Sequence, residues 1–461
     1  MSSDAAAVVV VGAGPAGIRA AITLAHAGII PVLVDEAPSP GGQIFRSPPS
    51  AIRRTPQALY GAQARRYLAL KAAFEACCER IEYHPSTLVW DIEGDELCTA
   101  SKRGTGRIRW SQLILATGAM DRIIPVRGWT QPGIYSLGGA QTALKAQGCA
   151  IGPEVVFLGT GPLLYLVAYQ YAKAGVNVRA VLDTSSMRPG VSAWLGLLRG
   201  GHTLLQGVYY LAALKLRGIP LFGGITPLEF AAREGGDIEV VFRDRGGAAR
   251  SVRGSAVGFG FGLKAETQLG DLLGLAFEFN AQHQQWLPTV DRHRRSSRQR
   301  VYLAGDGTAP QGVELAEISG ELAARTLLHD LGGEESEARR QWLMRTLEHA
   351  QSFRRALDEK LFALPRDMSN DVPDDVVVCR CEGINAGAIR RAAREAGANE
   401  INRLKAFTRV GMGRCQGRLC GAPASAILAA ACGQPLSAVG RLRGQAPTKQ
   451  LPLSVLAGSD T

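Results

Sequence analysis

Hydrophobic and polar positions divide the chain into two similar units of an α/β pattern. Unbroken apolar runs begin at Val8 and at Val155, and each leads through a glycine turn into a segment whose apolar residues have helical spacing. A short apolar run before such a segment predicts a buried parallel strand and its covering helix. Further buried strands are predicted at 113–115 and 301–303, each ending at a small-residue turn. The pattern therefore predicts an α/β fold in which a strand–turn–helix unit is repeated.

The first glycine turn has the spacing G-x-G-x-x-G. In this motif the first glycine makes a tight turn, the second lets a pyrophosphate approach the backbone, and the third lets the helix pack closely on the strand. The residues assigned to the dinucleotide in this turn are Gly12, Gly14, Pro15, Ala16 and Gly17. The next apolar run ends in Asp35 and Glu36, where a carboxylate can accept hydrogen bonds from ribose hydroxyls. A dinucleotide site is therefore predicted here.

The second glycine turn departs from this motif. Gly159 and Gly161 are present, but Leu164 stands at the third glycine position, and the following strand ends in Asp183. No lysine or arginine directly follows Asp183 to bind a 2′-phosphate, which favours NAD or ATP over NADP. We expect a second adenine nucleotide at this turn, and the missing third glycine argues against hydride delivery from it.

Three further motifs accompany the first turn. They comprise Gly42 and Gln43 in a P-G-G-Q loop, Ala116, Thr117 and Gly118 at the end of one strand, and Gly305 and Asp306 at the end of another. The combination resembles the FAD-binding half of flavoproteins with two dinucleotide domains. The resemblance implies non-covalent FAD, with the P-G-G-Q loop beside the flavin and Asp306 at the ribityl chain. It also implies a discontinuous Rossmann-like FAD-binding domain (1–120 and 290–330) around an inserted nucleotide-binding domain (121–289).

Two segments lie outside these units. Residues 331–374 are polar with helical character and are predicted to form a linker of one or two helices. Residues 191–217 are apolar and helix-like. This segment is predicted to be a core helix of the inserted domain, with a subunit contact or a membrane-surface patch as alternatives.

Four of the nine cysteines are spaced as metal ligands. They are Cys379, Cys381, Cys415 and Cys420, in the patterns C-x-C and C-x4-C. Four such thiolates in a chain without a signal-peptide pattern favour a metal over disulfides. Structural zinc usually takes cysteine pairs with wider spacing than C-x-C, so iron–sulfur is favoured, with zinc or a vestigial site as alternatives.

The cysteine pattern resembles the bacterioferritin-associated ferredoxin-like domain, which holds a [2Fe–2S] cluster. The resemblance implies a small α-helical domain at 375–435, with one helix at 384–398 between the cysteine pairs and a closing helix at 423–431. Residues 436–461 form a tail without a core of its own, which is expected to lie on a partner.

Charge and the chain start bear on partners and location. The net charge of +11 comes from scattered basic residues that do not alternate with aromatic ones, which argues against a nucleic-acid partner. The charge-free run at 155–172 is broken by a glycine–proline turn and is not predicted to span a membrane. Since no signal-peptide pattern opens the sequence, we expect a cytoplasmic protein, with peripheral attachment to the inner face of the cell membrane as the alternative.

The order of the three units resembles the large subunit of the flavin-dependent amine and opine dehydrogenases, a family that includes opine oxidase, D-hydroxyproline dehydrogenase, dye-linked proline dehydrogenase and hydrogen cyanide synthase. In that family a partner subunit, built like a D-amino-acid dehydrogenase, oxidises the C–N bond on its own FAD. The large subunit carries the electrons onward through flavin and [2Fe–2S] to a quinone or the respiratory chain. A small ferredoxin-like subunit often completes the complex, and an FMN can lie between the two larger subunits.

This resemblance assigns no catalytic residue to the present chain. Two other functions remain open from the sequence. One is a self-contained NAD(P)H-dependent oxidoreductase, and the other is an electron-transfer adaptor without turnover of its own.

Overall fold

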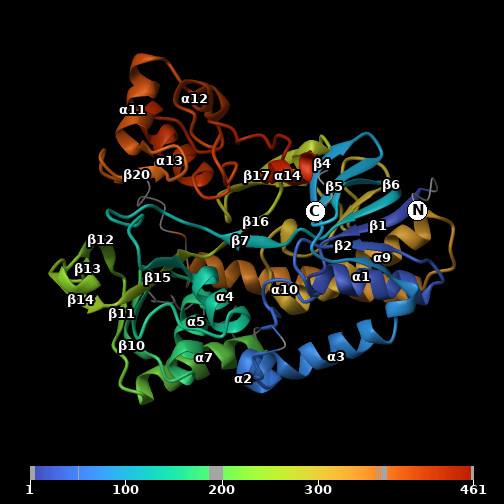
Figure 1. Ribbon diagram of the computed structural model, residues 1–461, viewed down its shortest axis with the longest axis horizontal. Helices are drawn as coiled ribbons and strands as arrows, with labels where there is room; N and C mark the ends of the chain where they lie inside the picture. Colours follow the sequence, from blue (N-terminus) through green and yellow to red (C-terminus); the bar gives the residue numbers. More distant parts are fainter. Residues whose placement is uncertain are drawn as a thin grey trace.

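Two parallel sheets organise the molecule, as the computed structural model in Figure 1 shows. The structure describes residues 6–49, 51–185, 201–360, 362, 364 and 371–457. The first sheet has the order β3-β2-β1-β6, and β19 pairs with the last residues of β6; all these neighbours run parallel. The strands are β1 (Ala7–Val11), β2 (Val32–Val34), β3 (Glu82–His84), β6 (Gly104–Leu115) and β19 (Val301–Leu303).

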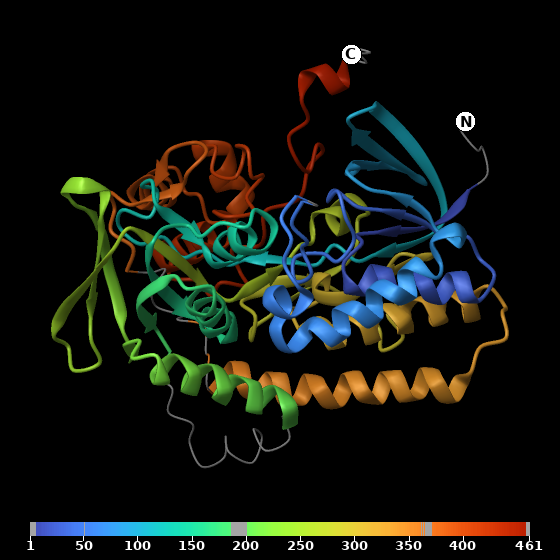
Figure 2. The same cartoon turned by 60° about the horizontal axis from the view of Figure 1, so that its bottom comes forward.

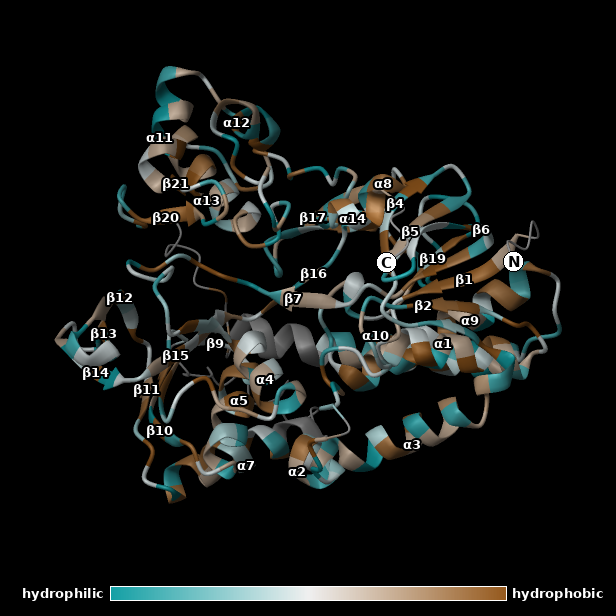
Figure 3. Cartoon of the chain, in the orientation of Figure 1, coloured by the Kyte–Doolittle hydropathy of each residue, from teal (hydrophilic) through white to brown (hydrophobic). Residues whose placement is uncertain are grey.

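Alternate residues of β1 face two different layers. Val10 packs with the helices α1, α3 and α9, whereas Val9 and Val11 pack with an antiparallel meander and with α8. A strand that is covered on both faces needs apolar residues at successive positions, which explains the unbroken valine run. Figure 3 shows the strands of the sheet in hydrophobic colours. The elements of these layers are α1 (Pro15–His26), α2 (Pro56–Tyr60), α3 (Ala64–Glu75), α8 (Gln268–Leu272), α9 (Val313–Asp330), β4 (Leu88–Glu93) and β5 (Glu96–Ser101).

The second sheet has the order β11-β10-β9-β15-β8 and is also parallel. Residues of α4, α5 and α7 cover one face, and the antiparallel sheet β12-β13-β14 covers the other. Its elements are β8 (Ile134–Ser136), β9 (Glu154–Thr160), β10 (Asn177–Asp183), β11 (Leu221–Gly223), β15 (Ala256–Phe261), α4 (Leu137–Ala146), α5 (Pro162–Lys173), α7 (Gly201–Leu216), β12 (Thr226–Ala232), β13 (Ile238–Arg243) and β14 (Ala249–Gly254). The predicted fold of two dinucleotide-type α/β units with a small C-terminal domain is confirmed.

Short antiparallel pairs and one long helix connect the units. Strand β7 (Ala119–Asp121) pairs with β16 (Leu263–Ala265), and β17 (Phe277–Asn280) pairs with β18 (Gln285–Pro288). Helix α10 (Glu337–Lys360) packs on α9 and runs along the underside of the molecule in Figure 2. The predicted linker therefore contains one long helix within its described residues. The 3-10 turns are η1 (Gly61–Gln63), η2 (Cys78–Arg80), η3 (Glu234–Gly236) and η4 (Gly305–Gly307).

The C-terminal domain is small and largely helical. It comprises β20 (Val377–Cys379), β21 (Ile384–Asn385), α11 (Ala386–Glu395), α12 (Ile401–Thr408) and α13 (Gly421–Cys432), and a last short helix, α14 (Leu453–Leu456), ends the described chain. The helix expected at 384–398 is formed as α11, but a second helix, α12, follows it before the second cysteine pair. Glu400 accepts hydrogen bonds from the amides of Asn402 and Arg403, and so caps a second helix.

The packing bears on three other predictions. Leu269 and Leu275 pack in the same cluster as β1, so this part of 121–289 groups with the first sheet. The tail lies on its own chain, where the Thr448 amide donates to the Trp90 carbonyl at 2.9 Å. Residues 191–200 of the apolar segment lie outside the described residues. In α7, Leu214 is buried in the inserted unit while Leu205 is 68% exposed, so the helix is only partly core. No described helix is long and apolar enough to cross a membrane.

Candidate functional site: a flavin edge beside a cysteine loop

The glycine turn, the acidic pair, and the A-T-G and A-G-D motifs each follow the carboxyl end of a strand in the first sheet. The glycine turn follows β1, Asp35 follows β2, Ala116 follows β6 and Gly305 lies just after β19. Since these strands are parallel neighbours, the motifs meet at one edge of the sheet. Ligands of open α/β sheets bind at such an edge.

The three glycines of the first turn are required for different reasons. A Cβ on Gly12 (φ 104°) would lie 2.3 Å from the Ala116 carbonyl oxygen, and a Cβ on Gly17 would lie 1.7 Å from the Gly12 carbonyl oxygen. Gly14 has an ordinary φ of −75°, and its Cβ would find only the Gly42 Cα, at 3.8 Å. The protein therefore leaves space at Gly14, at the start of α1, where unpaired helix N–H groups can bind a pyrophosphate.

The P-G-G-Q loop lies over this turn. A Cβ on Gly42 (φ 62°) would lie 2.8 Å from the Gly14 Cα, and the Gly41 amide donates to the Ala13 carbonyl at 2.8 Å. In the same loop, Arg46 has a buried Nε without a hydrogen-bond partner among the described residues. A half-buried arginine whose Nε lacks a partner, beside two glycine loops, fits a diphosphate.

Asp35 and Glu36 have different environments. Asp35 accepts hydrogen bonds from the amides of Ala37 (2.6 Å) and Ala13, so its carboxylate lies against the glycine turn. Burial raises the pKa of Asp35, and the two amide donors oppose this shift. Glu36 is half-exposed and forms an ion pair with Lys449 of the tail. Asp35 is therefore the better placed of the two for a ribose.

The A-T-G motif lies beside the turn that follows A-G-D and is hydrogen-bonded to a residue that the sequence did not single out, Glu266. A Cβ on Gly307 would lie 2.8 Å from Thr117 Oγ1. The Thr117 hydroxyl donates to the Glu266 carbonyl at 2.7 Å, and the Glu266 amide donates to the Gly118 carbonyl at 2.9 Å. Asp306 accepts from the Gln311 amide at 2.8 Å, just before α9 begins.

Lys145 is a second residue that sequence reasoning missed. It is 3% exposed, and its Nζ donates to the Ile44 carbonyl of the P-G-G-Q loop at 3.0 Å. Burial lowers its pKa to about 8. A lysine among the apolar residues of 137–146 was the available signal. Lys145 holds the loop that carries Gln43 against the inserted unit.

The second glycine turn is formed, but the carboxylate of Asp183 is already hydrogen-bonded within the protein. A Cβ on Gly159 would lie 1.7 Å from the Gly260 carbonyl oxygen, and Gly161 (φ 103°) precedes α5. Asp183 has no exposed surface and accepts from the Tyr165 hydroxyl (2.6 Å) and the Ser185 amide (2.7 Å). A ribose would have to compete for these carboxylate oxygens. The second nucleotide therefore stays a prediction.

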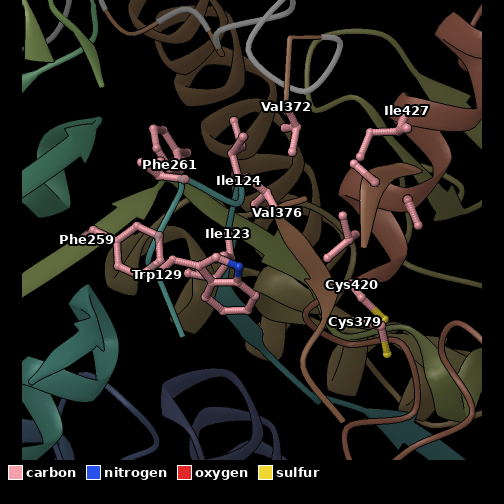
Figure 4. Packing of buried hydrophobic residues seen from close by; sticks show 14 of the residues in the cluster. Ile123, Ile124, Trp129, Phe259, Phe261, Val372, Val376, Cys379, Cys420 and Ile427 are labelled. Carbon is pink, nitrogen blue, oxygen red and sulfur yellow. The ribbon is translucent and has the colours of Figure 1, made fainter. Parts of the chain in front are cut away.

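The two cysteine pairs meet in the C-terminal domain. Their thiols form a row in which Cys420 hydrogen-bonds to Cys379 and to Cys415, and Cys415 also to Cys381. Figure 4 shows the side chains of Cys379 and Cys420 side by side at the edge of a buried apolar cluster. Among the described residues, no group of three or more His, Cys, Asp or Glu side chains forms a site for a metal ion. A [2Fe–2S] cluster binds four thiolates through two irons, so a row of pairs is compatible with it.

Backbone amides also approach the sulfur atoms. Gly411 and Glu382 hydrogen-bond to Cys379, and Gly417 and Leu419 to Cys415. A Cβ on Gly413 would lie 2.3 Å from Cys381 Cβ, so this loop requires glycine. Cys379 and Cys415 therefore each receive two backbone hydrogen bonds. Such contacts stabilise thiolates bound to iron and affect the cluster's potential.

Two of the four thiols ionise readily. The hydrogen bond from Cys420 is the largest effect that lowers the pKa of Cys379 to about 6 and that of Cys415 to about 5. The same bonds raise the pKa of Cys420, and burial raises that of Cys381. The thiolate is the form that binds iron, and Cys379 and Cys415 supply two ligands in that form near neutral pH.

An ion pair connects the loop from Cys415 to Cys420 (the cysteine loop) to the edge of the first sheet where the FAD motifs meet (the flavin edge). Arg418, between Cys415 and Cys420, donates from Nε to Glu266 Oε2 at 2.7 Å, and the two side chains are only 13% and 14% exposed. Glu266 is the residue whose backbone holds Thr117 and Gly118. The inserted unit also contacts the domain, since Trp129 Nε1 donates to the Val377 carbonyl at 2.6 Å.

Comparisons with known proteins agree with this arrangement. Residues 6–321 match the model of the pyridine nucleotide-disulphide oxidoreductase family, and residues 377–430 match that of the BFD-like [2Fe-2S] binding domain. The A subunit of opine oxidase from Rhizobium meliloti is 34% identical over 467 residues, which cover 98% of this chain and 87% of the relative. The HcnB subunit of hydrogen cyanide synthase from Pseudomonas aeruginosa is 34% identical over 471 residues, which cover 98% of each chain.

One solved structure extends over nearly the whole chain. The L-proline dehydrogenase from P. horikoshii aligns with 98% of this chain and 79% of its own, with a TM-score of 0.71 and 18% identity. At that identity it supports the fold alone.

Proposed function

The chain belongs to the family that contains the A subunit of opine oxidase and the HcnB subunit of hydrogen cyanide synthase, and we propose that it transfers electrons within a heteromeric dehydrogenase that oxidises an amino acid or secondary amine. It is an FAD-dependent oxidoreductase subunit with a [2Fe-2S] binding domain. The proposed substrate is of the opine, D-hydroxyproline, proline or glycine type. A partner subunit built like a D-amino-acid dehydrogenase oxidises its C–N bond.

One observation carries the proposal. Thr117 and Gly118 of the flavin edge are hydrogen-bonded to the backbone of Glu266, and the side chain of Glu266 is paired with Arg418 of the cysteine loop. Flavins accept electron pairs and release single electrons, and [2Fe–2S] clusters accept single electrons. The chain's own residues thus hold the two cofactor sites in contact through one mostly buried ion pair.

In this proposal Gly12, Gly14, Asp35 and the P-G-G-Q loop bind FAD, and Cys379, Cys381, Cys415 and Cys420 bind the cluster. An FMN shared with the partner, a quinone or respiratory-chain acceptor and a small ferredoxin-like subunit complete the path. A nucleotide at Gly159 and Gly161 would not deliver hydride, because Leu164 replaces the third glycine of the motif and the Asp183 carboxylate is already hydrogen-bonded. We place the complex in the cytoplasm, at or near the inner face of the cell membrane.

Anaerobic stopped-flow absorbance would test the proposal. The purified chain is mixed with NADH, and then, in complex with its co-expressed partner subunit, with a panel of amine substrates. We expect the flavin to bleach with an amine only when the partner is present. Direct bleaching by NADH would replace the proposal with a self-contained NAD(P)H-dependent oxidoreductase, and no bleaching in either mixture would favour an adaptor.

A further inference from the structure

A cavity of about 120 Å³ lies where β16 and the β17–β18 hairpin meet the cysteine loop. Its walls include Lys264 and Glu266 on one side and Gln416 to Arg418 on the other. None of its lining residues is a cysteine of the cluster loop or a residue assigned to FAD. The cavity is therefore a separate site between the two cofactor sites.

The charged groups of the cavity are unbalanced. The wall carries four cations and two carboxylates, which are Arg122, Lys264, Arg418, Arg441, Glu266 and Asp271. Each carboxylate is neutralised, since Glu266 pairs with Arg418 and Asp271 pairs with Arg441. Arg122 and Lys264 form no ion pair among the described residues, although Lys264 lies near enough to Glu266 for that carboxylate to raise its pKa.

Three hydrogen-bond donors of the wall lack acceptors. Arg122 is 5% exposed; it donates from Nη2 to the His283 carbonyl, but its Nε is buried without a partner. Trp286 Nε1 is also buried without a partner. The structure records no hydrogen bond or ion pair for Lys264 Nζ within the part of the chain that it describes. Burying donors without acceptors destabilises a fold by an amount comparable to a lost hydrogen bond. Three such donors in the wall of one cavity, against one unpaired acceptor at Gln268 Oε1, indicate an anionic ligand.

The environment of the two cations agrees with this. Burial, with a smaller effect of the Arg122 charge, lowers the pKa of Lys264 to about 8, and burial lowers that of Arg122 to about 10. Both groups are still mostly protonated at neutral pH. They repel one another across the cavity unless an anion lies between them.

We propose that this cavity binds a phosphate group, which accepts hydrogen bonds from Arg122, Lys264 and Trp286. A phosphate monoester carries nearly two negative charges at neutral pH and offers three acceptor oxygens, which matches the two unpaired cations and the indole donor. A carboxylate would leave one cation unbalanced. The cavity is several times larger than a single buried water requires, so a phosphate group fits.

A rival explanation is that Arg122 and Lys264 offset the negative charge of the cluster. The thiols of Cys415 and Cys420 raise the pKa of Lys264, so they are close enough to interact with it. This explanation predicts no phosphate binding, and it gives no role to the unpaired indole N–H of Trp286. Binding and redox measurements on the same variants therefore separate the two.

Isothermal titration of the full-length holoprotein with inorganic phosphate at low ionic strength is the primary test. We expect saturable binding that Lys264→Met and Arg122→Met each weaken by about tenfold or more, as expected for loss of a charged hydrogen bond. Trp286→Phe keeps a ring against Phe279 and should weaken binding by a smaller factor. Lys102→Met, which removes the same charge from an exposed turn, is the matched control and should change nothing.

A second set of titrations identifies the source of the phosphate group. FMN is compared with riboflavin, and AMP with adenosine, on the wild-type holoprotein and on Lys264→Met. Binding of inorganic phosphate alone indicates a free ion; preference for a monoester over its dephosphorylated form, lost in Lys264→Met, indicates the phosphate of a larger ligand. The proposal is overturned if neither binds, or if Lys264→Met binds as tightly as the wild type. A shifted cluster midpoint potential in Lys264→Met without any phosphate binding would establish the rival.

Discussion

At the residue scale, the fold requires two glycines of the first turn, and the third is assigned to ligand binding. Gly17 is required by the protein itself, because a Cβ there would overlap the Gly12 carbonyl oxygen. Gly14 has room for a Cβ, so the packing of the protein does not require a glycine there. The sequence predicted all three roles from the motif. Which glycine could be replaced without harming the fold became visible only from the neighbouring loop at Gly42.

Gly14→Ala should therefore yield a folded protein that has lost FAD. The added methyl group finds no protein atom closer than 3.8 Å but occupies the approach to the pyrophosphate. The flavin-to-protein absorbance ratio should fall to near zero while the far-UV circular dichroism stays unchanged. Gly17→Ala is the control and should yield insoluble or unfolded chain. A Gly14→Ala protein with its full flavin spectrum would refute the site assignment.

The buried amine of Lys145 should make the stability of the fold depend on pH. Its pKa is lowered to about 8 in the folded chain from 10.5, so between these values the unfolded chain binds more protons and stability rises with pH. Below pH 8 the protein carries the whole penalty of about 3 kcal/mol, partly offset by the hydrogen bond to Ile44. Lys145→Met should therefore be more stable than wild type at pH 7, by about 1–2 kcal/mol, and this advantage should shrink toward pH 10.

Thermal or denaturant unfolding at pH 7 and pH 10 would measure this difference. Lys173→Met, at an exposed position of α5, serves as the control. An advantage of the same size at both pH values would rule out the buried amine as its cause.

At the element scale, the apolar runs predicted both parallel sheets because each strand is covered on two faces. The C-terminal domain was harder to predict. Gly397, at φ 63°, and the cap at Glu400 divide a polar helical stretch into α11 and α12, and neither interrupts the apolar spacing strongly. The contacts made by Glu266, Lys145 and the tail could not be predicted either, because they join residues that are far apart in the sequence.

The N-cap of α11 allows the contribution of one local hydrogen bond to the stability of this domain to be measured. The Asn385 side chain accepts a hydrogen bond from the Ala388 amide at 2.8 Å. Asn385→Ala should destabilise the cysteine domain by about 1 kcal/mol, and Asn385→Ser should restore most of the loss. The loss should appear as a lower temperature for bleaching of the cluster absorbance, with flavin release unchanged. Equal behaviour of the alanine and serine variants would show that the cap contributes nothing.

At the scale of the whole molecule, the cysteine domain packs against both α/β units. Its apolar residues join the cluster that contains Phe230 and Phe259 of the inserted unit, while Arg418 reaches the flavin edge. The order of motifs predicted three units. The sequence could not predict that the third unit contacts both of the others.

Cys415→Ser should remove the cluster and leave the flavin in place, because the two sites share no residue. The electron paramagnetic resonance signal of the reduced protein should disappear, and iron should fall from about two per chain to a small fraction of that. Cys432→Ser, at a cysteine outside the ligand set that bonds to the Ala398 carbonyl, should retain both. Zinc instead of iron in wild-type protein purified without air would contradict the electron-transfer function.

The Glu266–Arg418 pair joins the two cofactor sites through groups that are mostly buried. Glu266→Gln keeps the backbone bonds to Thr117 and Gly118 but leaves the Arg418 guanidinium without its carboxylate. An unpaired buried charge is unfavourable, so the cysteine loop should leave the flavin edge in part of the molecules.

After rapid photoreduction of the flavin, reduction of the cluster should be about tenfold slower in Glu266→Gln and in Arg418→Met than in the wild type. The double variant should be slowed no more than either single variant. Arg127→Met breaks the exposed pair with Asp375 and is the matched control, with an expected change within about twofold. If the double variant showed the product of the two single effects, the residues would act independently. The link between the flavin edge and the cysteine loop would then be an ordinary surface contact.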